Sequence, residues 1–271
     1  MKRLLSAFLI AILPAIALAQ PNPTIAASAI GTSLKIDGVL NEPEWQVPGT
    51  VENFWSNFPA DTTPAQSQTR VKVLYNDEFI YFSAVLLNTR PVPRYVASSL
   101  RRDYPFAEND AFGVILDTYN DQTNGYGFYV SAYGVQREEQ LFSGVTTDGT
   151  WDAKWYSAVT HDSLSWTVEM AIPFKYVRFK EGSQNWNINF VRNDVSTNER
   201  SSWAPVPRNF LLSSLAYHGQ LQWQQTPEKV KKSYSIIPSV TYTANQAGNE
   251  SMNSTVKLSL DGKVNITSAL N

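Results

Sequence analysis

The sequence contains several carboxylate side chains that could act as acids or bases. Four of them lie in or beside segments with strand-like patterns: Glu108, Asp110, Asp117 and Glu169. Two carboxyl groups that flank a glycosidic bond at a fixed separation form the catalytic pair of most glycoside hydrolases. The spacing along the chain does not place any two of these residues close together. We therefore interpret each as a strand-end or solvent-facing carboxylate and expect no catalytic residues.

The same residue types could bind a metal, although the pattern is incomplete. Four acidic residues could supply the oxygen ligands of a calcium ion: Asp37, Glu42, Asp110 and Asp117. They form no compact Asp-x-Asp loop, so the metal ligands stay unknown and calcium is only a possible cofactor. The two histidines, His161 and His218, have no partner at the spacing of a zinc site or a Ser-His-Asp triad. The lack of cysteine excludes disulfides and thiolate chemistry.

Asp110 and Asp117 bracket the segment that we expect to organise the fold. Residues 111–117 alternate between two sets of side chains, and residues 126–133 alternate again after a polar break that ends in glycine. Period-two alternation predicts strands with one buried face, and the polar residues between them favour a chain reversal. The segment 108–133 is therefore predicted to be a central antiparallel hairpin.

Further segments follow the same strand pattern. We predict hairpins at 69–88 and 154–172 and strands at 26–30, 186–194 and 219–223. Residues 42–45 predict a short helical turn that begins with proline and places Trp45 in the core. The segments 54–68, 90–105, 143–152 and 200–217 are predicted to be loops. Many short strands without a long helical pattern predict an all-β fold, an antiparallel β-sandwich of jelly-roll or immunoglobulin-like type, at 26–225.

The first residues of the chain carry an export signal. Lys2 and Arg3 precede an apolar run that ends in Ala17-Leu18-Ala19, so residues 1–19 are predicted to be a signal peptide. The mature protein is then expected outside the cytoplasm. A formal net charge of -2 offers no basic field that would attract nucleic acid.

A charged linker, 226–233, separates the predicted sandwich from a different pattern. In 234–244 and 256–266 apolar residues alternate with polar ones, over lengths that suit strands crossing a bilayer at a tilt. Two such strands cannot close a barrel. We therefore interpret 234–271 as the first strands of a truncated β-barrel. The expected localisation is the outer membrane, with the sandwich in the periplasm or at the cell surface.

The sequence resembles carbohydrate-binding module family 9 in five motifs that follow one another in order: KIDGVLNEPEW, VKVLYNDEFIYFSAVL, ENDAFGVILD, WTVEMAIPF and WNINFVRND. The resemblance covers about residues 30–223. It implies a β-sandwich related to the broader DOMON-like sandwiches, with sugar binding as its function. Combined with the exported start and the barrel-like strands, it makes the chain similar to large bacterial outer-membrane proteins. In these, such a domain precedes a barrel of uncharacterised family.

The resemblance also implies where a sugar would bind. Family members hold the sugar ring between two tryptophans, and polar residues on the strands contact its hydroxyls. Here Gly113, Tyr129 and Val191 occupy the polar strand positions, while Asn193 and Asp194 match the family's Asn-Asp pair. The expected ligand-binding residues are Tyr104, Phe106, Tyr129, Trp203 and Phe210. Because the polar contacts are replaced, the resemblance implies weak binding led by ring stacking.

We expect a non-catalytic carbohydrate-binding-like domain of an exported outer-membrane β-barrel protein, which acts in glycan binding or polysaccharide use and takes glycans or sugar ends as partners. Two alternatives stay open. Family 9 modules are commonly fused to glycoside hydrolases, so the chain could be part of an enzyme of carbohydrate catabolism that acts on O-glycosyl bonds. It could instead be an interaction domain that docks a protein or plugs the barrel with the same aromatic face.

Overall fold

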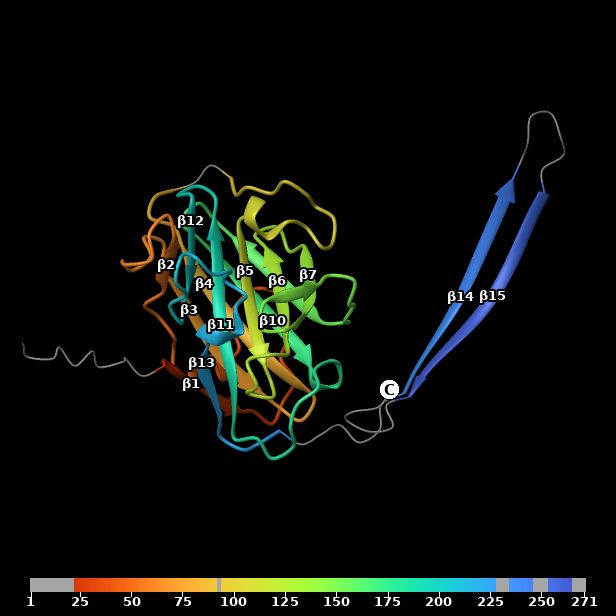
Figure 1. Ribbon diagram of the computed structural model, residues 1–271, viewed down its shortest axis with the longest axis horizontal. Coiled ribbons are helices and arrows are strands. Elements are labelled where there is room, and N and C mark those ends of the chain that lie inside the picture. The colour runs from red at the N-terminus through yellow and green to blue at the C-terminus, as the bar shows by residue number, and fades with distance from the viewer. Residues whose placement is uncertain (1–21, 92–93, 228–233, 246–252, 265–271) are drawn as a thin grey trace, which may run out of the picture.

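The computed structural model describes residues 22–91, 94–227, 234–245 and 253–264. The predicted signal peptide at 1–19 and residues 228–233 of the predicted linker lie outside these ranges. The described chain is almost entirely β-structure, which confirms the predicted fold class (Figure 1). Its helical parts are short 3-10 turns: η1 (Pro43–Gln46), η2 (Phe106–Glu108), η3 (Phe174–Tyr176) and η4 (Leu215–Tyr217).

Two sheets pack face to face to form the sandwich. The first sheet has the order β8 (Thr146–Asp148), β7 (Gln136–Phe142), β6 (Gly125–Ser131), β5 (Ala111–Asp117), β11 (Asn185–Asp194) and β13 (Gly219–Trp223). The second sheet has the order β3 (Thr69–Tyr75), β4 (Phe79–Leu87), β10 (Ser165–Pro173) and β9 (Tyr156–His161). The predicted hairpins at 69–88, 108–133 and 154–172 are thus confirmed as β3–β4, β5–β6 and β9–β10.

Strand β1 (Thr24–Ala29) joins the two sheets into one curled sheet. Residues 24–27 pair with β13, and residues 28–29 pair with β3. Both pairings are parallel, so the expectation of a purely antiparallel sandwich needs this correction. The strand can serve both sheets because its side chains Ile25 and Ala27 are buried between them.

The hydrophobic core lies between the two sheets and follows the alternation in the sequence. Phe112, Val114 and Leu116 of β5 point into it and are fully buried. Aromatic rings from both sheets meet there, as in the pair Phe82 and Phe190, whose centroids are 6.0 Å apart. A buried aromatic side chain removes a large apolar area from water, so this layer supplies most of the driving force for folding.

Four strands lie in segments that the sequence pattern did not mark. β2 (Trp55–Phe58) and β12 (Glu199–Ser202) fall in or at the edge of predicted loops and pair with each other, and β12 also pairs with β11. β8 lies in the predicted loop 143–152. β7 reads QREEQLF, which shows no apolar alternation, yet its two glutamates are buried. These strands are held by hydrogen bonds to neighbouring strands and, in β7, by ion pairs. Neither interaction requires apolar residues at alternate positions of the sequence.

Smaller apolar clusters cover the outer faces of both sheets. On the second sheet, residues 30–46 lie over Leu74, Tyr81 and Ala171, and Trp45 is buried there as predicted. On the first sheet, the chain around Tyr104 and the chain around Leu215 lie over Tyr129. Each sheet therefore carries a loop-covered outer face on which a ligand site could form.

A separate two-stranded sheet contains β14 (Tyr234–Asn245) and β15 (Asn253–Val264), paired antiparallel along their whole length. Both predicted strands in this region are present. No helix in the described ranges is long and apolar enough to cross a membrane.

We expect residues 20–226 to fold alone into a soluble, β-rich domain. Strands β1 to β13 pair only among themselves, and the hydroxyl of Tyr75 binds the backbone N–H and C=O of Gln225, each at 2.7 Å. A matched fragment that ends at residue 217 lacks β13, which links β11 to β1, and is expected to stay unfolded. Circular dichroism checks both fragments; an unfolded long fragment contradicts this account.

Candidate functional site

The outer face of β5, β6 and β11 is shaped by two glycines and one tyrosine. Tyr129 pairs with Gly113 across the hairpin, and Gly127 precedes it by two residues on the same face. A Cβ atom added at Gly113 would lie 2.2 Å from Tyr129 Cδ1, and one at Gly127 would lie 2.7 Å from the hydroxyl. The Tyr129 ring therefore lies flat across both glycines and fills the space that their missing side chains leave.

A buried polar network holds this ring in place. The Tyr129 hydroxyl donates to Glu139 Oε1 at 2.7 Å, and Arg137 Nη2 donates to Glu139 Oε2 at 2.7 Å. Arg137 also donates to the Tyr104 carbonyl at 3.0 Å. Burial, followed by the nearby Glu139 carboxylate, raises the pKa of Tyr129 well above its usual range. The phenol thus stays protonated and acts as a donor to the carboxylate.

Two polar atoms beside this network have no partner among the described residues. They are the hydroxyl of Tyr104 and Nε of Arg137, and both are buried. A buried donor without a partner is unfavourable, and neither atom is accessible to a ligand in this conformation. Phe106 packs its ring against Tyr129 at a centroid distance of 5.2 Å and remains partly exposed. The face thus combines an accessible aromatic ring with buried hydrogen-bonding groups.

Asn193 fixes the loop that carries Phe106. Its side-chain amide donates to the carbonyl oxygens of Phe106, Ala107 and Asn109, at 3.3, 3.2 and 2.7 Å. Asn109 in turn bonds to Ser98, which closes the loop on itself. The Asn of the Asn-Asp pair is therefore a loop-positioning residue in this chain.

The structure brings three of the five expected ligand-binding residues together. Tyr104, Phe106 and Tyr129 share one cluster, in which Tyr104 and Tyr129 are 1% and 4% exposed. Trp203 is 6% exposed and packs on Phe190 in the core, at a centroid distance of 5.6 Å. Phe210 is 47% exposed and lies against Tyr217.

The binding role of these five residues stays a prediction. Their exposure identifies Phe106 and Phe210 as the rings that a ligand reaches without movement of the protein. Tyr104 and Trp203 present no exposed ring face to a ligand. Tyr104 packs in the outer cluster of the first sheet and Trp203 packs in the core, and residue type alone does not reveal this packing.

The candidate carboxylates do not converge. Asp110 and Asp117 sit at opposite ends of the first sheet's β5, about 20 Å apart for a strand of this length. Asp110 accepts backbone N–H groups of Val96 and Val195, at 2.6 and 2.7 Å, and burial raises its pKa. Asp117 accepts three backbone N–H groups of the turn after β5 and the side-chain amide of Asn187. Both residues fix loops, and Glu108 is exposed.

Glu169 was expected on a solvent face, and the structure corrects this. It is fully buried on the outer side of β10, under residues 30–46. Its carboxylate accepts the N–H groups of Asp37 and Gly38, at 3.0 and 2.8 Å, and Trp45 Nε1 at 2.9 Å. Burial raises the pKa of Glu169, and the three hydrogen bonds offset only part of this rise. Glu169 therefore anchors the covering segment to the sheet.

The four acidic residues considered for calcium divide between two sheets. Asp37 and Glu42 belong to the segment over the second sheet, and Asp110 and Asp117 to the ends of β5. Within the part of the chain that the structure describes, no three His, Asp or Glu side chains come close enough to hold a metal ion.

Two buried glutamates of β7 were missed by the sequence analysis. Glu138 is fully buried and binds the Arg102 guanidinium, and it accepts Ala153 N at 3.3 Å and Trp155 Nε1 at 3.1 Å. Glu139 belongs to the Tyr129 network. Adjacent glutamates normally indicate a solvated segment. The arginines that neutralise them, Arg102 and Arg137, give the only sequence signal, and it is a weak one.

The geometry defines a β-sandwich with an aromatic cluster on the outer face of one sheet. The chain belongs to the carbohydrate family 9 binding domain-like family, whose model matches residues 36–207. This confirms the family resemblance. A comparison with curated proteins found no match.

Three solved structures share the fold. A candidate carbohydrate-binding protein from Bacteroides uniformis has a TM-score of 0.59 and 13% identity, and the match covers 75% of this chain and 100% of that one. A family 9 carbohydrate-binding module from Caldicellulosiruptor kristjanssonii in complex with cellotriose gives 0.54 and 15%, covering 77% and 95%. Its complex with glucose gives 0.52 and 15%, covering 77% and 99%. At these identities the likeness concerns the fold alone.

Proposed function

We propose that this chain is a non-catalytic carbohydrate-binding domain whose sugar site is the outer face of β5, β6 and β11. The observation that carries the proposal is the Phe106–Tyr129 ring pair, which lies directly on the Glu139–Arg137 network. A pyranose has an apolar ring face and a rim of hydroxyls, and these two parts of the site match them. Solved members of the same fold are complexes with cellotriose and glucose.

The Tyr129 ring occupies the space over Gly113 and Gly127, and this limits the affinity that we expect for a sugar. Because a sugar ring cannot occupy the space over these glycines, it stacks on the exposed part of Phe106 instead. Each hydroxyl that is buried without a partner costs about 1–3 kcal/mol. Two lost contacts therefore weaken binding by roughly one to four powers of ten. We propose weak binding of simple sugars and a longer glycan as the natural partner.

Titration calorimetry of residues 20–226 with glucose, cellobiose and xylobiose is expected to give dissociation constants in the millimolar range. The double change Phe106→Ala and Phe210→Ala should weaken binding further, because it removes the two expected ligand-binding rings that a ligand can reach. Tyr119→Ala, at a tyrosine that is 36% exposed, is the matched control. Micromolar binding that survives the double change would place the site elsewhere.

One observation favours the interaction-domain alternative. Phe210 and Leu211 are neighbours in the chain, and they are 47% and 61% exposed. Exposed apolar neighbours suit contact with a protein surface or a barrel wall as well as with a sugar. In that case the double change would abolish partner capture while every sugar titration stays flat. We propose no catalytic step, since Asp110, Asp117 and Glu169 lie apart and hold backbone groups.

We further propose that the domain belongs to an exported protein and precedes a β-barrel in the outer membrane. The support comes from β14 and β15, whose register aligns Val240 with Leu258 and Tyr242 with Val256. These four side chains are 61–79% exposed and lie on one face, while the opposite face carries serine, threonine and charged residues together with Ile237. Strands of 12 residues with one apolar face are typical of a barrel wall facing lipid.

Fractionation of cells that express the full-length gene product checks the membrane proposal. We expect the protein in the outer-membrane fraction, because the apolar face of β14 and β15 is stable only against lipid or protein. Val240→Lys with Leu258→Lys places two charges on that face and should prevent insertion, whereas Thr241→Lys on the polar face should not. Recovery of the unaltered protein from the soluble periplasm would contradict the proposal.

A further inference from the structure

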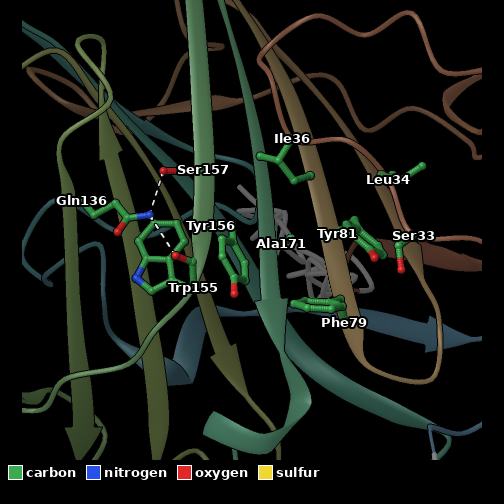
Figure 2. Close-up of a pocket in the computed structure, with 10 residues that line it drawn as sticks. All are labelled: Ser33, Leu34, Ile36, Phe79, Tyr81, Gln136, Trp155, Tyr156, Ser157 and Ala171. Atoms are coloured by element: carbon green, nitrogen blue, oxygen red, sulfur yellow. Dashed lines mark hydrogen bonds between the residues drawn. The ribbon is translucent and has the colours of Figure 1, made fainter.

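The outer face of the second sheet carries a second candidate site, which is remote from the sugar face described above. It is a trough of about 570 Å³ between β9 and β4, and β10 forms its floor (Figure 2). Ligand sites in proteins have volumes of roughly 300–1,000 Å³. The trough is thus large enough for a small organic molecule or one unit of a chain.

The sequence creates this trough by placing a small residue between two aromatic ones. Ala171 of β10 pairs with Tyr156 of β9 on one side and with Tyr81 of β4 on the other. Side chains of directly paired residues stand on the same face of a sheet. The methyl group of Ala171 therefore forms the floor, while Tyr156 and Tyr81 form the walls, as Figure 2 shows.

The walls combine an exposed ring with hydroxyl groups. Tyr156 is 46% exposed, and Phe79 packs against both Tyr156 and Tyr81, at centroid distances of 6.0 and 5.7 Å. Ser157 Oγ accepts a hydrogen bond from Gln136 Nε2 at 2.9 Å, and the Tyr81 hydroxyl accepts one from Asn76 Nδ2 at 3.1 Å. Ser157 Oγ is an acceptor in its bond, so its own hydrogen can be donated to a ligand. Tyr81 is 1% exposed, so it shapes the wall without offering its hydroxyl to a ligand.

The lining selects the chemical class of the ligand. None of the residues that line the trough carries a charge, so ionic groups find no counter-charge there. A neutral molecule with one apolar face and hydroxyls around its edge fits an exposed tyrosine ring that is flanked by hydroxyl and amide groups. A pyranose has this distribution, whereas an apolar peptide would offer no acceptor to the hydroxyl hydrogen of Ser157.

We propose that this trough is a second carbohydrate-binding site, which takes a neutral pyranose unit of a glycan by stacking on Tyr156. The choice of a carbohydrate as ligand rests on the proposed function, whereas the position of the site does not. Two weak sites on opposite faces give a domain that holds an extended or multi-chain glycan far more tightly than a single sugar. The second site would thus explain how a weak first site can serve glycan binding.

Nuclear magnetic resonance titration of residues 20–226 with cellobiose tests the proposal in the Phe106→Ala, Phe210→Ala background. We expect saturable shifts of the Ser157 and Ala171 amides in that background. Adding Tyr156→Ala should weaken this binding roughly three- to tenfold. Ala171→Leu fills the floor and should abolish it, while Tyr119→Ala should leave it unchanged. Thermal melting of each variant confirms that the domain is folded.

The outcomes separate this inference from the proposed function. Wild-type shifts confined to the amides of Gly113 and Gly127, with none at Ser157 and Ala171, would overturn the second site and leave the first intact. Trough shifts that Tyr156→Ala does not weaken would also overturn it. Trough shifts without any at Gly113 and Gly127 would support the second site and refute the first. Flat titrations at both faces would refute both.

Discussion

Replacing Arg192 with leucine is expected to destabilise the domain by about 3–5 kcal/mol, a large share of its stability. Arg192 lies in β11 and is 2% exposed. Its guanidinium donates to Asp194 Oδ2 at 2.9 Å and to the carbonyl of Leu87 at 2.8 Å, with further bonds to Ser67, Gln68 and Asn88. These bonds tie the first sheet to the ends of β3 and β4 in the second. Without the guanidinium, the buried Asp194 carboxylate loses its ion-pair partner and keeps only the hydrogen bonds from Ser196 and Thr197.

Urea unfolding at pH 7 measures this loss. Arg192→Lys keeps the positive charge but cannot form the same fork of hydrogen bonds, so it should destabilise the domain less than leucine does. Arg101→Leu, at an exposed arginine, is the matched control and should change stability little. A loss below about 1 kcal/mol for Arg192→Leu would show that the buried network does not hold the sheets together.

The domain should lose about 3 kcal/mol of stability through His218 alone as the pH falls from 6.5 to about 4. His218 is buried, and both ring nitrogens lack partners among the described residues. Burial lowers its pKa from 6.5 to about 3, because the imidazolium would be desolvated. Between these two values the unfolded chain binds a proton that the folded chain does not bind. Stability is therefore full above pH 6.5 and is lost progressively below it.

Comparison of variants isolates this contribution from other titrating groups. Asp110 and Glu169 have raised pKa values, so each contributes stability at low pH and loses that contribution as the pH rises through its pKa in the folded protein. This pH dependence is opposite in sign to that of His218. Urea unfolding of wild type and His218→Leu at pH 7 and at about pH 4 gives the difference. His161→Leu removes the other, exposed histidine and serves as the control. An unchanged pH dependence in His218→Leu would contradict the buried, neutral imidazole.

The fold was largely predictable because strand alternation records which residues face a core. Phe112, Val114 and Leu116 point inward as the pattern indicates, and the three hairpins follow from turns between alternating segments. The pattern does not record what covers the outer side of a strand. Glu169 stands on an outward position, yet residues 30–46, more than 120 positions away in sequence, bury it.

The candidate site was predictable in part, for the same physical reason. Residue type indicated aromatic side chains around β5 and the following loops, and Phe106 and Tyr129 do lie together. The sequence did not reveal that the Tyr129 ring fills the space over two glycines, because this depends on cross-strand register. It also did not reveal the Glu139–Arg137 pair, since charged residues in a row usually indicate solvent exposure.

The central claim is that a sugar binds on the outer face of β5, β6 and β11, and mapping of amide shifts in the wild-type domain tests it most directly. Phe106 packs on the Tyr129 ring, which covers Gly113 and Gly127, so a ligand that stacks on Phe106 and shifts this ring pair changes the resonances of the two glycine amides. We expect both amides, together with that of Phe106, to shift in a saturable way with millimolar cellotriose. If these three amides do not shift even when cellotriose is added well above millimolar concentration, the account is contradicted.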